Sequence, residues 1–184
     1  MAHNQKTDRR ILRTRRMLRE TLMNLIMEHG YDVLTITDIA NMADIRRGTF
    51  YDHYDSVDAL LLACLRDEFE GVIEHSSELF DVLQILRYLE QHAARFRRLC
   101  EGRAELLLYA FFRDTLPGSQ IQPVAHPQDD AAARSQAFIN EYRAASEAAM
   151  IVWWLQHDML YTPEKLAEML ADIQEKGLSE KFRD

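Results

Sequence analysis

The sequence contains little of the two residues that most often interrupt helices. Only 4 prolines and 6 glycines occur among 184 residues, and both residue types are unfavourable inside a helix. Stretches in which apolar and polar residues alternate, as they do in half-buried strands, are also lacking. The segment 117–130 holds three of the prolines and is expected to be an exposed loop. Together these absences predict an all-α protein.

Cysteine is even scarcer than proline, with 2 residues against 4. The two cysteines, Cys64 and Cys100, are far apart and lie inside apolar, helix-patterned runs, which excludes the class of small domains held together by disulfides. The sequence shows neither a signal peptide nor an apolar run long enough to cross a bilayer. We therefore expect a cytoplasmic protein with two unpaired, buried thiols and no membrane association.

The patterns that carry common catalytic chemistry are missing as well. There is no HExxH, GxSxG, phosphate-binding P-loop or dinucleotide fingerprint, and the 7 histidines form no close pairing with the cysteines. The adjacent carboxylates of Asp129 and Asp130 fall in the expected loop. We expect no catalytic residues, no metal site and no cofactor.

Net positive charge is concentrated in the first twenty residues of the chain. The net charge is -8, yet the first twenty residues hold seven Lys or Arg against two Asp or Glu, a net charge of +5 that leaves -13 on the rest. Such asymmetry would attract phosphate at one end of the molecule and repel it at the other. A basic run is also common on an ordinary solvated helix face, so the charge alone leaves both readings open.

Residues 35–54, TITDIANMADIRRGTFYDHY, read as two short helices joined by a tight turn. Thr35 stands three residues before Asp38, the spacing of a capping box that satisfies amides of the first helical turn. Asp44 lies where the chain must turn, and a short polar side chain tolerates the left-handed conformation found there. Phe50 is expected to anchor the second helix to the core. Without further information, such a helix pair also fits many other helical proteins.

The segment resembles the DNA-binding part of the TetR-type transcriptional regulators, over roughly residues 9–62. Gly48, Thr49, Tyr51 and His53 at this spacing carry the resemblance. It implies a three-helix, helix-turn-helix domain in which the second helix of the pair is the recognition helix and enters the DNA major groove. The implied DNA-binding residues are Thr35, Thr37, Arg46, Arg47, Gly48, Thr49, Tyr51 and His53.

Within that set, the resemblance places Thr37, Arg47, Gly48 and Thr49 near base edges, and Thr35, Tyr51 and His53 beside phosphates. Arg47 is our candidate for direct readout, because a guanidinium can bond both O6 and N7 of guanine. Three positions depart from the family pattern. Asp44 replaces the usual glycine, Arg46 stands where a capping serine is common, and Val57 replaces a phosphate-binding lysine.

Helical spacing predicts further helices along the rest of the chain. We expect helices over 7–29 (capped by Thr7 after a mobile arm, with Ile11 in the inner stripe), 57–75, 79–92, 94–101, 103–115, 131–157 and 163–175 (capped by Thr162 and stopped at Gly177). No Gly, Pro or Ser-rich spacer separates the N-terminal helices from the others. We therefore divide the chain into a DNA-binding domain, 1–62, and a larger helical effector-binding and dimerisation domain, 63–184.

The last two helices carry small and large apolar residues that suit a homodimer, because two such helices facing their copies would form a four-helix interface. The candidate interface residues are Phe138, Tyr142, Ala145, Ala149, Val152, Trp153, Leu166, Met169, Leu170 and Ile173. Burial against the same chain is the alternative. Two DNA-binding heads about 34 Å apart would recognise an inverted repeat in a double-stranded operator.

Residues around Trp153, Trp154 and the TPEKLAEML segment resemble the TetR subgroup that contains a regulator of dihydroxyacetone kinase genes. We expect a repressor that a small apolar or aromatic effector releases. The candidate pocket residues are Tyr88, Phe96, Cys100, Tyr109, Phe112, Met150, Trp154 and His157. The subgroup resemblance leaves open a protein effector and a solidly packed domain. A helical adaptor for proteins, or a small-molecule binder without a DNA function, are the alternatives outside this class.

Overall fold

The computed structural model describes residues 2–73, 79–116 and 131–179, and every regular element in these ranges is an α-helix. The elements in chain order are α1 (Ala2–His29), α2 (Ile36–Met42), α3 (Arg47–Tyr51), α4 (Val57–Ile73), α5 (Leu79–Gln91), α6 (Ala93–Leu99), α7 (Arg103–Thr115), α8 (Ala131–Gln156) and α9 (Pro163–Ser179). The predicted all-α class is thereby confirmed. The expected loop 117–130 lies outside the described residues.

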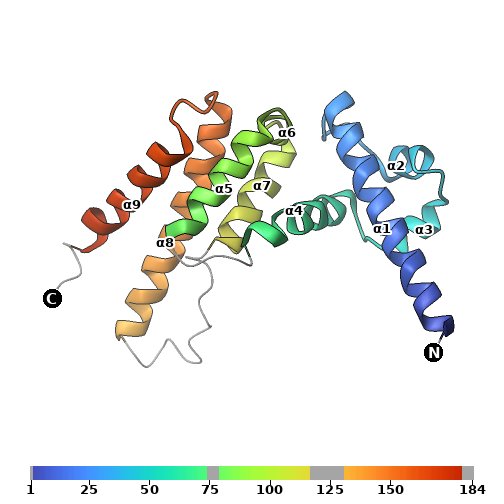
Figure 1. The fold of residues 1–184 in the computed structure, drawn as a ribbon, viewed down its shortest axis with the longest axis horizontal. Helices are drawn as coiled ribbons and strands as arrows, with labels where there is room; N and C mark the ends of the chain where they lie inside the picture. Colours follow the sequence, from blue (N-terminus) through green and yellow to red (C-terminus); the bar gives the residue numbers. More distant parts are fainter. Residues whose placement is uncertain (1, 74–78, 117–130, 180–184) are drawn as a thin grey trace.

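Helices α1, α2 and α3 form a small N-terminal unit at one end of the molecule (Figure 1). Leu18, Leu22 and Ile26 of α1 are fully buried, and so are Ile39 of α2 and Phe50 of α3. These side chains meet in one apolar core, which the helical spacing of the α1 leucines and isoleucine provides. The unit is therefore held by packing against α1 rather than by the two short helices themselves.

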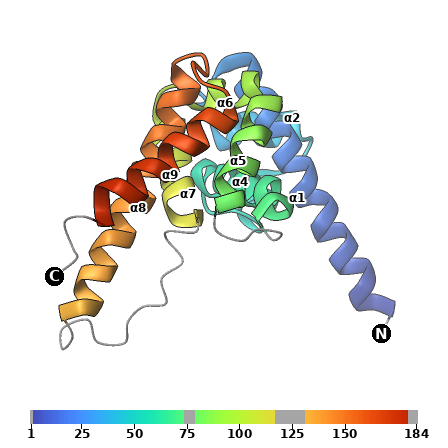
Figure 2. The ribbon, with the colours of Figure 1, turned by 60° about the vertical axis from the view of Figure 1, so that its left-hand side comes forward.

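Helix α1 begins at Ala2, so the prediction that Thr7 caps this helix after a mobile arm was wrong. No proline or glycine separates residues 2–6 from the following turns, and extending an existing helix costs far less than starting one. Ile11, predicted in the inner stripe, is 37% exposed. Figure 2 shows that the N-terminal end of α1 extends beyond the other helices.

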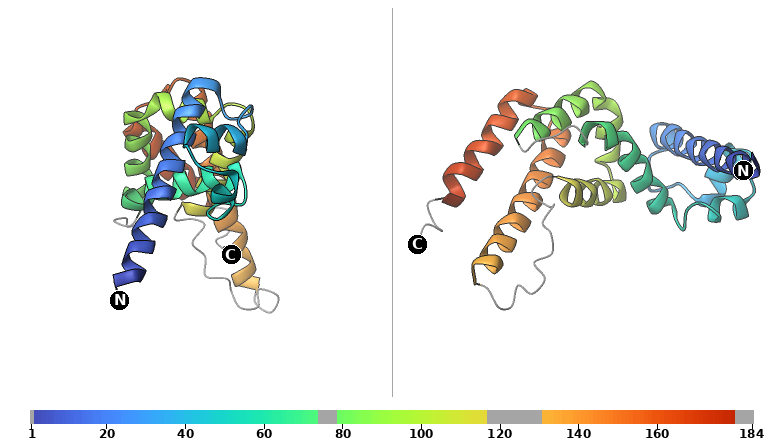
Figure 3. Two further views of the ribbon diagram at one scale, coloured as in Figure 1. Left: turned by 90° about the vertical axis from the view of Figure 1, so that its right-hand side faces the viewer. Right: turned by 60° about the horizontal axis from the view of Figure 1, so that its bottom comes forward.

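Helix α4 connects the two ends of the molecule. Ser56 caps it, because the amide of Ala59 donates to the Ser56 hydroxyl oxygen over 3.0 Å. Its N-terminal part packs on α1, and further along it contacts α5 and α7. Figure 3 shows α4 between the N-terminal unit and the remaining helices. A movement of α4 would therefore change its contacts both with the N-terminal unit and with the remaining helices.

Helices α5 to α9 form the C-terminal bundle, with α7 packed on α8 and α9 packed mainly on α5. Its interior is aromatic at the point where α4 enters. Phe69 of α4 lies 5.3–5.5 Å, between ring centroids, from Tyr88, Phe96, Phe111 and Phe112. Such close rings in tilted and edge-on arrangements are typical of a packed core.

Helix α9 is capped as predicted, since the amide of Lys165 lies 3.3 Å from the Thr162 hydroxyl oxygen. The expected stop at Gly177 was wrong, because the helix continues to Ser179. A single glycine costs a helix only about 1 kcal/mol relative to alanine, which the neighbouring residues can offset. Cys64 and Cys100 are both buried and unpaired, as expected. None of the described helices is long and apolar enough to span a membrane.

Candidate nucleic-acid interface

The beginning of α2 is fixed by the predicted capping box. The Asp38 amide donates to the Thr35 hydroxyl over 3.2 Å, and the Thr35 amide donates back to the Asp38 carboxylate over 2.9 Å. The Thr35 hydroxyl also donates to that carboxylate over 2.6 Å. These hydrogen bonds from Thr35 lower the pKa of Asp38, because they stabilise the charged form. The cap thus sets where the first helix of the pair starts.

The turn between α2 and α3 uses the left-handed residue that the sequence predicts. Asp44 has φ 51°, and its amide donates to the Asn41 carbonyl over 3.1 Å. The Ile45 amide then donates to the Ala40 carbonyl over 2.9 Å, and the Ile45 side chain packs against the core. Both contacts hold the chain so that α3 leaves the turn in a fixed direction.

Helix α3 is anchored by one buried ring, and its other side chains are exposed or half-buried. Phe50 is fully buried, with its ring 5.9 Å from Tyr51 and 6.2 Å from Tyr54. Arg46 is the N-cap residue, but its side chain forms no capping hydrogen bond, and the residue is exposed. The Arg47 guanidinium lies 3.4 Å from the Tyr51 hydroxyl, one turn further along. The helix therefore presents a polar face above an apolar anchor.

All eight predicted DNA-binding residues lie within this helix pair and the segments flanking it. Six of them are exposed, namely Thr35, Thr37, Arg46, Arg47, Gly48 and Tyr51, and the other two, Thr49 and His53, are half-buried. A Cβ placed on Gly48 would meet no atom within 4 Å. The backbone of α3 is consequently open to approach at this glycine.

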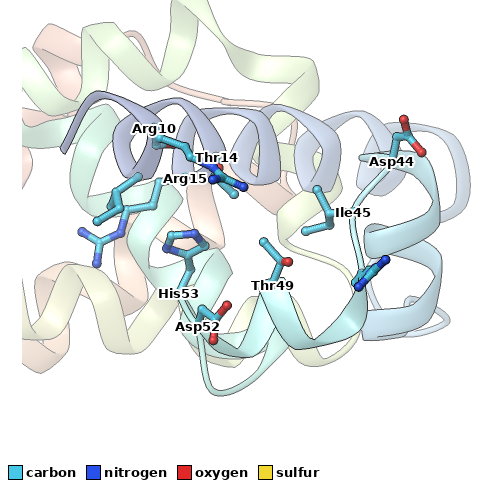
Figure 4. A pocket seen from close by; sticks show the side chains of 10 residues that line it. Arg10, Thr14, Arg15, Asp44, Ile45, Thr49, Asp52 and His53 are labelled. Carbon is cyan, nitrogen blue, oxygen red and sulfur yellow. The ribbon is translucent and has the colours of Figure 1, made fainter. Parts of the chain in front are cut away.

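A groove of about 670 Å³ separates α3 from the N-terminal half of α1 (Figure 4). Thr49 and His53 face it from α3 and the residues after it, and Arg46 borders it at the start of that helix. From α1 come Arg10, Ile11, Thr14 and Arg15. Asp44 and Asp52 also line it, so three arginines, one histidine and two aspartates surround the groove.

The eight DNA-binding residues predicted above do not include the groove residues of α1, although the basic N-terminal segment that contains Arg10 and Arg15 was expected to attract phosphate. Arg10 and Thr14 are one helical turn apart, as are Ile11 and Arg15, so both pairs can face the same side. The Thr14 hydroxyl donates a hydrogen bond to the Arg10 carbonyl oxygen over 3.0 Å. The helical spacing of these residues could be read from the sequence. Only the position of α3 beside α1 shows which of the α1 arginines border the groove.

The predicted effector residues range from fully buried to exposed. Phe96, Cys100, Phe112 and Trp154 are buried, Tyr88 and Tyr109 are half-buried, and Met150 and His157 are exposed. The indole of Trp154 donates to the Tyr161 carbonyl over 2.8 Å. His157 stacks on Trp153, with 4.4 Å between ring centroids. The two stacked residues are four apart, which brings them together on one side of the helix.

A second cavity of about 260 Å³ lies where α1, α4, α5 and α6 meet. Tyr88 is the member of the predicted effector set that borders it. Its hydroxyl donates to Glu68 over 2.9 Å, and Arg95 pairs with the same carboxylate oxygen over 2.8 Å. Burial, followed by the Glu68 hydrogen bond, raises the pKa of Tyr88 to about 12. The walls of this cavity are therefore polar and internally paired.

The ten candidate interface residues fall into three groups. Val152, Leu166 and Leu170 are buried within the chain and belong to its own core. Phe138, Tyr142 and Ile173 are 64%, 50% and 57% exposed. Ala145, Ala149, Trp153 and Met169 are half-buried. The exposed and half-buried members on α8 recur at helical spacing, so they form one stripe along the helix.

No group of three or more His, Cys, Asp or Glu side chains is placed to hold a metal ion in the part of the chain that the structure describes.

Two protein-family models match the chain. The model described as bacterial regulatory proteins of the tetR family matches residues 18–64. The model described as a transcriptional regulator C-terminal region matches residues 79–176, which is more than half of the chain.

Individual proteins resemble the chain over shorter stretches. An uncharacterized HTH-type transcriptional regulator, YxbF of Bacillus subtilis (strain 168), is 36% identical over 72 residues, 39% of this chain and 19% of the relative. The HTH-type dhaKLM operon transcriptional activator DhaS of Lactococcus lactis subsp. lactis (strain IL1403) is 24% identical over 90 residues, 47% of this chain and 48% of the relative. The matched segments thus span less than half of either relative.

Solved structures share the fold over nearly the whole chain. A TetR transcriptional regulator from Streptococcus agalactiae 2603V has a TM-score of 0.63 at 22% identity, with 93% of this chain and 98% of that one covered. The dihydroxyacetone kinase operon activator DhaS has a TM-score of 0.55 at 20% identity, with 90% and 96% covered. At these identities the likeness concerns the fold.

Proposed function

Since the chain belongs to the TetR family of transcriptional regulators, we propose that it binds an inverted-repeat operator as a homodimer in the cytoplasm and represses transcription until an effector releases it. The observation that carries the proposal is the exposed polar face of α2 and α3 above the buried Phe50. An α-helix fits the major groove of DNA, where base pairs present distinct donors and acceptors. The fixed turn at Asp44 supports insertion of α3 in one orientation.

Base recognition is assigned to Arg47, Thr37, Gly48 and Thr49. Arg47 stands in the first turn of α3 with an exposed guanidinium, and a guanidinium bonds two acceptors of guanine at once. Thr37 is exposed on α2, while Gly48 leaves room for the α3 backbone to come close to a base pair. Thr49 faces the groove beside α1, so it would act at the border of the contact.

Phosphate contacts surround this centre. Thr35, Arg46, Tyr51 and His53 supply them from the helix pair, and arginines of α1 extend the basic surface across the groove. Thr35 is exposed at the residue where α2 begins, and the N-terminal end of a helix favours anions. Contacts of this kind fix the position of a protein on DNA, and they make binding sensitive to salt.

Dimerisation is assigned to the apolar stripe of α8 and its neighbours on α9. Phe138 and Tyr142 are large and at least half exposed, and Ala145 and Ala149 continue the same side of the helix with small residues. Ile173 of α9 is 57% exposed. Small residues between large ones let a second helix approach closely. Helices α8 and α9, which carry these residues, lie at the opposite end of the molecule from α3 (Figures 1 and 3).

The dimer is tested by sedimentation of the purified protein. Tyr142→Arg would place a charge in the stripe and should shift the protein to a monomer that remains folded. Glu168→Arg is the matched control, because Glu168 is exposed on α9 and lies on another side of that helix from Ile173. If Tyr142→Arg leaves a stable dimer, the stripe is not the interface.

The nature of the effector has two candidates. A small apolar or aromatic effector requires a cavity in the C-terminal bundle, yet the rings around Phe69 are in close contact there. This packing favours the second candidate, a protein effector that acts on the surface. Thermal unfolding with candidate small molecules separates the two, since a ligand of the native state raises the unfolding temperature.

The sign of regulation is tested with a reporter gene behind the bound DNA. The proposed repressor lowers expression by occupying a site that overlaps the promoter. The relative named as an activator of the dhaKLM operon shows that a similar protein can act in the other direction. Deleting the gene should raise reporter expression, and a fall would make this protein an activator.

DNA binding itself is tested by selection from a random DNA pool, followed by fluorescence anisotropy with the enriched sequence. We expect an inverted repeat and a clear preference over a scrambled sequence. Arg47→Ala should reduce this preference, whereas Arg113→Ala, an exposed arginine paired with Asp114 on its own helix, should not. Failure to enrich any sequence would count against the proposal.

A further inference from the structure

Five residues join the N-terminal unit to the start of α7. Tyr31 and Asp32 follow α1, Asp58 lies in the first turn of α4, and Gly102 and Arg103 begin α7. We call these residues the junction cluster. They come from three parts of the chain. Some of the contacts among them link the N-terminal helices to the C-terminal bundle, and the others support those links.

Asp32 caps α7 from outside that helix. The N-cap residue Gly102 has no side chain, and the amide of Arg103 donates to the Asp32 carboxylate over 2.9 Å. A negative charge is favourable at this end of a helix. Gly102 has φ 59°, and a Cβ there would lie 1.9 Å from an Asp32 oxygen. Glycine is therefore required at this position both by the positive φ and by the Asp32 carboxylate, which occupies the space that a Cβ would need.

The side chain of Arg103 closes the cluster. Its guanidinium carbon lies 5.5 Å from the centroid of the Tyr31 ring, and one of its nitrogens lies 3.2 Å from an Asp58 carboxylate oxygen. The Tyr31 hydroxyl donates a hydrogen bond to the same oxygen. Burial, reinforced by Asp58, raises the pKa of Tyr31, so the hydroxyl keeps its proton. The stacked cation and the shared carboxylate define one geometry.

We propose that Arg103 is a positioning residue for operator binding, which through the junction cluster fixes the angle between the N-terminal unit and the C-terminal bundle. In a dimer held through the bundle, this angle sets the separation of the two α3 helices. The inference rests on the proposed dimeric DNA binding. An operator with two half-sites requires one such separation, because the two heads must reach successive major grooves on one side of the duplex.

The exposure of the cluster suits a contact that can be opened. The side chains of Arg103 and Asp58 are 60% and 43% exposed, and an exposed ion pair changes an equilibrium constant by about five-fold at most. An effector that binds only the arrangement in which this ion pair is broken therefore needs to supply little free energy to break it. The cluster determines orientation more than it determines stability.

The first test measures the angle without DNA. Spin labels on cysteines introduced by Met42→Cys in α2 and Glu90→Cys in α5, both exposed positions, report the distance between the two parts. Labelled chains are diluted into unlabelled ones so that only distances within a chain are seen. We expect one narrow distribution, which Arg103→Ala and Asp32→Ala broaden. Arg113→Ala on the same helix should leave it unchanged.

Rescue separates the role of the arginine from general damage. Arg103→Lys keeps the positive charge beside Asp58 and should restore much of the narrow distribution that Arg103→Ala loses. The two native cysteines are buried, with pKa values raised to about 12, so the introduced thiols react selectively. A distribution that stays narrow in Arg103→Ala and Asp32→Ala would overturn the proposal.

The second test uses operators whose half-sites are moved apart or together by one base pair. Because each of the two protomers loses its ion pair, Arg103→Ala should lose about ten-fold in affinity for the best spacing but little for the others, so its spacing preference flattens. An equal loss at every spacing would refute a positioning role. If the wild-type protein selects no spaced repeat, the dimeric DNA-binding proposal has failed, and the distance measurement still decides whether the junction cluster sets the angle.

Discussion

Gly48 offers a substitution that should separate folding from DNA binding. It is the second residue of α3, it is exposed, and a Cβ at this position would meet no heavy atom within 4 Å. Its φ is not among the positive values of the chain, so alanine fits the backbone without strain. In the free protein, Gly48→Ala should therefore be tolerated by every neighbouring group.

The expected effect on stability is a gain. Alanine is favoured over glycine within a helix by about 0.5–1 kcal/mol. For a chain of this size, each kcal/mol raises the unfolding temperature by roughly 2–4 °C. Gly48→Ala should consequently unfold about 1–4 °C above the wild type in a thermal melt followed by circular dichroism.

The expected effect on DNA binding is a loss. If the α3 backbone lies against base edges, the added methyl group overpacks that contact, at about 1–3 kcal/mol for each head. A dimer carries two heads, so the loss reaches at least about 2 kcal/mol, or roughly 30-fold in affinity. Fluorescence anisotropy with the selected operator, at one fixed salt concentration, measures this change.

Gly71 provides the matched control. It lies in α4, it is exposed, and a Cβ there would also meet no atom within 4 Å. Gly71→Ala should bring a similar gain in stability with unchanged operator affinity. Should Gly48→Ala bind the operator as tightly as the wild type, the α3 backbone does not approach the bases, and the assignment of Gly48 is refuted.

Individual side chains provide four more predictions. Arg47→Ala should weaken operator binding by about 1–3 kcal/mol per half-site and relax the preference at one base pair, as seen by anisotropy with variant operators. Arg15→Gln should reduce the slope of log affinity against log salt by about 1 for each phosphate that the protein no longer neutralises, and an unchanged slope would exclude a phosphate role. Phe69→Ala should lower the free energy of unfolding in urea by about 3–5 kcal/mol, because the ring is fully buried among four others; a decrease below about 1 kcal/mol would contradict such packing. Burial raises the pKa values of Cys64 and Cys100 to about 12, so neither thiol should react with Ellman's reagent at neutral pH in the folded state. The stability gained by burying neutral thiols is complete below their unfolded pKa, near 9, and should be lost as the pH rises toward 12.

Local signals in the sequence predicted the helix pair closely. The capping box of Thr35 and Asp38, the left-handed Asp44 and the buried Phe50 all occur as expected. Each depends on contacts within a few residues, so the chemistry that decides it is contained in a short stretch of chain. Most helix bounds in the bundle agree for the same reason.

Helix ends were less predictable where no strong signal decides between continuing and stopping. Thr7 is a good capping residue, yet α1 starts five residues earlier. Gly177 is a good terminator, yet α9 passes through it. In both cases the free-energy difference is about 1 kcal/mol, which neighbouring residues can reverse.

Contacts between distant segments could not be read from the sequence. Asp32 and Arg103 are 71 positions apart, and neither stands out in its own segment. The groove beside α3 likewise depends on how α1 packs against it, which selects Arg10 and Arg15 among several arginines. The effector residues were chosen for type alone, and the fold distributes them between core and surface.

The measurement that bears most directly on the account is a hydroxyl-radical footprint on the selected operator. Two copies of α3, held apart by the bundle and the junction cluster, should protect two patches on one face of the duplex, about 34 Å between centres. A single protected patch, or two patches on opposite faces, would contradict the proposed dimeric reading of the DNA.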